Sequence, residues 1–94
     1  MGVKTMKAVI SVIGKDKVGI LAAVSNECAD CGANIIEVTQ SVLQEMFCMI
    51  MLVDIEKMNV SLSDFSAKLD KLGEKMNVSV HCMHEDIFNS MHRI

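Results

Sequence analysis

The sequence is poor in aromatic rings and in clustered positive charge. Its 94 residues include three Phe but no Trp and no Tyr, the nine Lys and Arg residues are scattered, and the formal net charge is −3. Proteins that bind nucleic acid use basic patches to contact phosphates and aromatic side chains to stack on bases. We therefore expect that nucleic acid is not a partner of this protein.

Long apolar segments are also missing. The longest uninterrupted apolar run is Met46–Val53, whereas a helix that crosses a bilayer needs about 20 residues. The N-terminal residues do not form the apolar stretch of a secretory signal. We therefore expect a cytoplasmic protein without a membrane partner, in which the four cysteines stay reduced.

The sequence does contain apolar residues in periodic patterns. The expected strands are 6–13, 34–43, 46–55 and 78–83, and the expected helices follow Asp16 and Ser61. This β-α-β-β-α-β order predicts a ferredoxin-like α+β fold, a four-stranded antiparallel sheet with two helices on one face. Residues 86–94 are expected to form a last helical turn or a frayed tail.

Spacing also predicts which side chains face the core. The positions expected to be buried are Leu21, Val24, Cys28 and Cys31 in the first helix, Leu62, Phe65, Leu69, Leu72 and Met76 in the second, and Ile36, Val38 and Val42 in strand 34–43. Ser61 and Asp64 resemble a capping box, and Gly32 and Asn77 are expected to end the two helices.

Strand 46–55 is apolar on both faces, which predicts cover on both sides. The two helices would cover one face. Apolar residues make up 51% of the chain, more than the core of one small domain hides. We therefore expect a second subunit on the other face, in a homodimer or higher homo-oligomer.

The turn between the first strand and the first helix is the best candidate for a ligand site. Asp16 is placed to cap the helix by accepting an N–H from Val18 or Gly19, and Gly19 lets a ligand come close because it lacks a Cβ. A carboxylate beside free helix-start amides suits a zwitterionic amino acid. The alternative is an ordinary helix cap whose glycines serve only the turn.

Asn34 is the second candidate, at the start of strand 34–43. Its amide could hydrogen-bond an α-amino or α-carboxylate group, and it could meet the first turn across a dimer. The alternative is a turn residue that tolerates a left-handed backbone or caps its own segment.

The thiol and imidazole groups give only weak evidence for a redox or metal site. Cys28 and Cys31 form a CxxC pair, but they lie at the C-terminal end of a helix, where the helix dipole disfavours a thiolate, so we expect core packing. His81 and His84 point to opposite faces of a strand and cannot readily share one metal ion. A thiol-based metal-binding protein is therefore the least favoured function.

Few patterns suggest catalysis. Ser11, Ser25 and Ser41 lack a nearby His–acid pattern. Acylphosphatases share the predicted topology but use an Arg in the first loop, whereas the only Arg here is Arg93. We expect that this protein is not an enzyme and needs no cofactor.

Gly14–Ser25, followed by Cys31–Ile36, resembles the signature of the ACT domain, a ligand-sensing regulatory module, and the resemblance extends over Met6–Glu85. The sequence is similar to free-standing single-ACT proteins and to the ACT domains of the glycine cleavage system repressor. Many members have Pro where this chain has Val18, which implies a less rigid loop here.

The resemblance implies an ACT-like domain over 6–88, with terminal extensions 1–5 and 89–94. It also implies an amino acid or similar small metabolite bound at a homodimer interface. The ligand-binding residues it implies are Asp16, Val18, Gly19, Ile20, Leu21, Asn34 and Ile35. An allosterically regulated partner protein is implied but not identified, and the alternative is an ACT-like interaction dimer without a ligand.

Overall fold

The structure, a computed structural model, describes residues 6–15 and 19–91. The elements in chain order are β1 (Lys7–Lys15), α1 (Ile20–Cys31), β2 (Asn34–Leu43), β3 (Met46–Asp54), α2 (Leu62–Met76), β4 (Ser79–His84) and α3 (Glu85–Met91). The predicted β-α-β-β-α-β order is confirmed, and the C-terminal segment adds a short helix. Among the described residues, no helix is both long and apolar enough to span a membrane.

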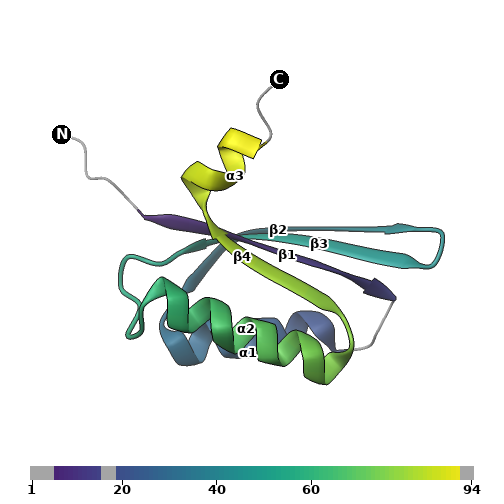
Figure 1. The fold of residues 1–94 in the computed structure, drawn as a ribbon, viewed down its shortest axis with the longest axis horizontal. Coiled ribbons are helices and arrows are strands. Elements are labelled where there is room, and N and C mark those ends of the chain that lie inside the picture. The colour runs from purple at the N-terminus through teal and green to yellow at the C-terminus, as the bar shows by residue number, and fades with distance from the viewer. Residues whose placement is uncertain (1–5, 16–18, 92–94) are drawn as a thin grey trace.

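The four strands form one antiparallel sheet in the order β2-β3-β1-β4. Figure 1 shows α1 and α2 side by side on one face of this sheet and α3 on the opposite side. We call the face toward α1 and α2 the inner face and the other the outer face. The ferredoxin-like α+β fold is therefore confirmed, with β2 and β4 as the edge strands.

The core lies between the inner face and the two long helices. Alternate residues of the central strands point into it, so β3 contributes Phe47, Met49, Met51 and Val53 and β1 contributes Ala8, Ile10 and Val12. From α2, Phe65 and Leu69 are fully buried, and Leu62, Leu72 and Met76 pack against them as predicted. The helices of one chain thus cover one face of β3.

Helix α1 begins differently from the prediction. Its N-cap is Gly19, in a left-handed conformation with φ 90°, rather than Asp16, which lies outside the described residues. Ile20 then becomes the first buried residue, four positions before Val24, while Leu21 is 38% exposed. The predicted burial of Leu21 was wrong because the buried side of α1 runs through Ile20, Val24, Cys28 and Cys31, which leaves Leu21 beside it.

The other helix ends agree with the sequence. Gly32 ends α1 with φ 79°, and Asn77 ends α2 with φ 61°. The Ser61 hydroxyl accepts a hydrogen bond of 3.1 Å from the backbone N–H of Asp64, which completes the N-cap of α2.

Strand β2 departs from simple alternation. A bulge lies between Ile35 and Glu37, where the register with β3 shifts by one residue. Ile35 and Val38 therefore pack on the core, whereas Ile36 is 46% exposed. Val42 is also exposed, because the β2–β3 hairpin extends beyond the helices (Figure 1). The predicted inward position of Ile36 was wrong because of the bulge, whereas Val42, which pairs with the core residue Phe47, lies on the predicted face but is not covered there.

The outer face is not bare along its whole length. Val9 points to the outer face, yet it is only 4% exposed, and it lies outside the main core cluster. Helix α3 contacts β1 and β4 and accounts for this burial. One end of the outer face is therefore covered by the chain itself.

Candidate functional site

The predicted ligand-binding residues fall into two groups at opposite ends of α1. Gly19, Ile20 and Leu21 lie at its start, whereas Asn34 and Ile35 begin β2, just after its end. A helix of 12 residues is about 18 Å long at 1.5 Å per residue. One chain therefore does not bring the two groups together. Asp16 and Val18 lie outside the described residues.

The start of α1 presents backbone amides without a side-chain cap. The N-cap residue Gly19 makes no side-chain cap hydrogen bond, and the first helical bond runs from Ala23 N–H to the Gly19 carbonyl over 2.9 Å. The N–H groups of residues 20–22 precede that first bond and so have no carbonyl within the helix. These amides and the helix dipole favour an anionic group at this position.

Gly19 leaves space beside these amides. A Cβ built on Gly19 would have no described atom within 4 Å, so an approaching group would not be blocked there by the described part of the chain. The buried side chain of Ile20 anchors the helix start in the core. As far as the described residues extend, the helix start is held by Ile20 and the space beside Gly19 is open.

Asn34 is the exposed first residue of β2, opposite Asp54 of β3. Its backbone is extended rather than left-handed, so the turn conformation considered for it is not adopted. Within the described residues, no hydrogen bond engages its side-chain amide. Ile35, the next residue, is half-buried against the core. The side chain of Asn34 is therefore exposed, whereas that of Ile35 packs against the core.

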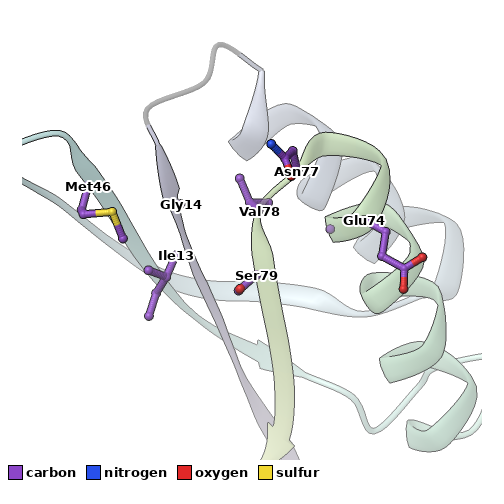
Figure 2. A pocket seen from close by; sticks show the side chains of 8 residues that line it. Ile13, Gly14, Met46, Glu74, Asn77, Val78 and Ser79 are labelled. Carbon is purple, nitrogen blue, oxygen red and sulfur yellow. The ribbon is translucent and has the colours of Figure 1, made fainter.

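A depression of about 420 Å³ lies where the end of β1 meets the turn between α2 and β4. Its lining residues are Ile13, Gly14, Met46, Gly73, Glu74, Asn77, Val78 and Ser79 (Figure 2). The polar side chains do not converge, because Glu74 points away from β1 (Figure 2). The depression includes none of the predicted ligand-binding residues.

Three of the four cysteines belong to the core or pack against it, namely Cys28 and Cys31, as predicted, and Cys82. Cys28 and Cys31 are both buried on α1, and burial raises the pKa of the Cys28 thiol to about 11. Burial, with the nearby Glu27 carboxylate, also raises the pKa of Cys31. On β4, burial raises the pKa of Cys82 to about 12. These thiols stay protonated at neutral pH, which disfavours both nucleophilic and metal-binding roles.

The two histidines on β4 lie on opposite faces, as predicted. His81 pairs with Ser11 and His84 with Ala8 in the register of β1 and β4. Across residues 6–15 and 19–91, no three His, Cys, Asp or Glu side chains gather as a metal site would require. His84 instead caps α3, since its Nδ1 accepts a hydrogen bond of 3.0 Å from the backbone N–H of Asp86.

That cap is a structural detail that sequence reasoning missed. The signal was a His followed two residues later by Asp at the end of a strand, a pattern that is not distinctive by itself. The exposed apolar residues at the hairpin end were missed because nothing local shows how far the hairpin extends beyond the helices.

Comparison with known proteins agrees with this architecture. A family model described as the ACT domain matches residues 7–83. A UPF0237 protein of Clostridium acetobutylicum is 48% identical over 89 residues, which cover 95% of this chain and all of that protein. An ACT domain protein from Streptococcus pneumoniae superimposes with a TM-score of 0.79 at 35% identity, over 90% of this chain and 96% of the other.

A second solved structure shares the fold at lower identity. A protein described as a candidate glycine cleavage system transcriptional repressor gives a TM-score of 0.73 at 24% identity. The match covers 85% of this chain and 46% of that protein. This likeness concerns the fold alone.

Proposed function

The chain belongs to the ACT domain family, and from that premise we propose that it binds an amino acid or similar small metabolite between two copies of itself. ACT domains are in general regulatory modules that bind small molecules, and the family is in general non-catalytic. The observation that carries the proposal is the separation of the two residue groups by the length of α1. A ligand that contacts both groups needs a second copy.

The edge strand β2 supports such a pairing. Natural edge strands are commonly shortened, or protected by Lys, Pro or several charges. The ten residues of β2 include no Lys and no Pro, and Glu37 is their only charge. Two β2 strands that pair antiparallel about a two-fold axis would satisfy the backbone groups of both edges.

Antiparallel pairing of β2 would also join the two halves of the site. Helix α1 contacts β2, whereas α2 contacts β4, so α1 is the helix nearest this edge. Because β2 starts where α1 ends, the start of α1 lies toward the far end of β2. Pairing therefore directs Asn34 of one copy toward Gly19 of the other.

The two groups have complementary chemistry for a zwitterion. Amides at the start of α1 would bind the carboxylate, and the Asn34 side chain would hydrogen-bond the α-amino or carboxylate group. Asp16 would supply the negative charge for the ammonium group. Residues around Leu21 would contact the side chain of the bound amino acid and so select one amino acid over others.

The regulatory effect would follow from linkage. A ligand that bridges two copies stabilises the dimer in proportion to its preference for the paired state. A regulated protein that binds only one state of this equilibrium would then respond to the amino acid. We place this activity in the cytoplasm, as the sequence predicts.

A thermal-shift screen of amino acids, followed by calorimetry on any hit, tests the proposal. Asp16→Ala should abolish binding, and Asn34→Ala should weaken it at least about tenfold, a loss of about 1.4 kcal/mol. Asp70→Ala and Asn26→Ala remove the same groups from exposed positions outside the proposed site and should bind like the wild type.

Mixing the two site variants separates a shared site from a site within one chain. In a dimer of Asp16→Ala with Asn34→Ala, one of the two shared sites carries both changes and the other carries neither. Binding should therefore return on mixing. A site within one chain predicts no recovery, and no binding of any amino acid by the wild type would leave an interaction dimer without a ligand.

A further inference from the structure

The two long helices form a groove that is bordered by lysines. Helices α1 and α2 contact each other and lie side by side (Figure 1). Between them is a groove of about 240 Å³, lined by Glu27 of α1 and by Lys68, Lys71, Leu72 and Lys75 of α2. None of the residues proposed to bind the amino acid lines this groove, so it is a separate surface.

The three lysines form a row along α2. They lie three and four residues apart, which places them on one side of the helix. At 1.5 Å per residue the row is about 10 Å long, and all three residues are exposed. Burial raises the pKa of the Cys31 thiol of α1, and the Lys68 charge opposes that rise, so Lys68 lies toward α1. The row therefore borders the groove along its length.

The positive charge of this row is not neutralised by ion pairs. Across residues 6–15 and 19–91, none of the three ammonium groups has an ion-pair partner. Glu27, on the opposite wall, accepts a hydrogen bond of 3.7 Å from the Cys31 thiol. In a chain with a formal net charge of −3, the groove is a local excess of positive charge.

The other acidic residues of α2 lie away from the groove lining. Asp64 belongs to the first turn of the helix, one turn before Lys68. Asp70 lies toward β4, where its charge adds to burial in raising the pKa of Cys82. Glu74 lines the depression beside β4. The side of α2 toward α1 is therefore the basic side of this helix.

The groove combines this basic row with an apolar floor. Leu72 is half-buried between the lysines and packs against the core. A compact anion such as phosphate is bound by donors that converge on one point, whereas a row suits an extended anion. Nucleic acid is disfavoured because the net charge is negative and no Trp or Tyr is present to stack on bases. A peptide with acidic side chains along one edge and an apolar side chain beside them fits both features.

We propose that an acidic segment of another protein docks in the groove between α1 and α2. Its carboxylates would pair with the three lysines, and an apolar side chain would pack on Leu72. Glu27 would repel carboxylates and so fix which edge of the segment faces α2. An amphipathic helix is a suitable form for this segment, because it presents acidic and apolar residues at the same spacing as the groove.

The groove would stay open in the proposed dimer. Helix α1 lies toward the β2 edge and α2 toward the β4 edge, so pairing of β2 edges would take place on the side of α1 away from the groove. The regulatory meaning of docking rests on the proposed function, since α1 would contact the amino acid at its start and the docked segment at Glu27. Docking itself does not require the amino acid.

Fluorescence anisotropy with a labelled Glu/Leu peptide tests the proposal on the full chain. The peptide carries Glu at the spacing of the three lysines and Leu beside them, and its binding should weaken as salt is added. Combined Lys68→Gln, Lys71→Gln and Lys75→Gln should weaken binding at least about tenfold, because three charge pairs are lost. A scrambled peptide of the same composition should also bind more weakly, by at least about threefold.

A matched variant separates the groove from general charge attraction. Combined Lys7→Gln, Lys15→Gln and Lys57→Gln removes the same charge from β1 and from the turn after β3, and binding should stay within about twofold of the wild type. Thermal unfolding checks that both triple variants fold. No binding by the wild type, an equal loss in the two variants, or tighter binding of a single-stranded RNA of equal charge would overturn the proposal.

The same variants keep this proposal distinct from the amino-acid site. Asp16→Ala should bind the Glu/Leu peptide like the wild type, because Asp16 lies outside the groove lining. The variant without the three groove lysines should still bind amino acids. Loss of peptide binding in Asp16→Ala would overturn a separate groove, whereas failure of every amino acid to bind would leave peptide docking unchanged.

Discussion

Gly14 and Val78 approach so closely that a Cβ built on Gly14 would lie 2.6 Å from Cγ1 of Val78. Gly14 belongs to β1 and Val78 to the turn that enters β4, so this contact sets how near the end of α2 comes to the sheet. The glycine that opens the ACT-like signature is therefore required by packing within the chain. A ligand is not needed to explain it.

This contact predicts a compensating pair of variants. Gly14→Ala should lower the free energy of unfolding by about 1–3 kcal/mol, because the new methyl group overpacks the site. Val78→Ala removes the opposing methyl groups and should restore part of that loss when combined with Gly14→Ala. Urea unfolding of both single variants and the double variant measures the coupling, and strictly additive losses would contradict the contact.

Gly19 and Gly32 should respond differently to alanine. Both have positive φ, of 90° and 79°, which costs a residue with a Cβ about 1–2 kcal/mol. A Cβ on Gly32 would also lie 3.2 Å from the Lys57 carbonyl oxygen, whereas one on Gly19 would meet no described atom within 4 Å. Gly32→Ala should therefore be the more destabilising of the two in thermal unfolding, and the reverse order would contradict this view of α1.

The His84 cap should control the order of α3. His84→Ala removes the acceptor for the Asp86 N–H and should destabilise α3 by about 1 kcal/mol, a usual value for a lost helix cap. Hydrogen exchange of the α3 amides should become faster, and Val9 beneath α3 should become more exposed. His84→Asn keeps a side-chain acceptor and serves as the control. Equal rates of hydrogen exchange at the α3 amides in His84→Ala and His84→Asn would show that the cap does not stabilise α3.

The buried Cys28 thiol predicts a loss of stability at alkaline pH. Its pKa is raised from 9.0 to about 11 by burial, so the folded protein holds this proton while the unfolded chain releases it. Stability is therefore intact below about pH 9 and falls between pH 9 and 11, by about 2 kcal/mol. Unfolding curves across this range measure the fall, and Cys28→Ala should show a shallower dependence on pH.

Much of the fold follows from short-range sequence patterns. The spacing of Phe65 and Leu69 placed α2 correctly, and Ser61, Gly32 and Asn77 marked helix ends. Each of these signals depends on residues within one or two turns, which is why they can be recognised without knowledge of the rest of the chain. The exposure of Leu21 and Ile36 could not be predicted in this way, because Ile20 takes the buried position at the start of α1 and a bulge shifts the alternation in β2 by one residue.

The candidate site shows the same division between local and long-range information. The sequence by itself determined its parts, a glycine-bounded helix start and an Asn that opens β2, since both depend on the chain nearby. Only the tertiary structure decided that α1 holds them at opposite ends, that β2 is an edge strand, and that α3 covers Val9. These relationships arise from strand pairing and helix packing between residues far apart in the chain, which no local pattern specifies.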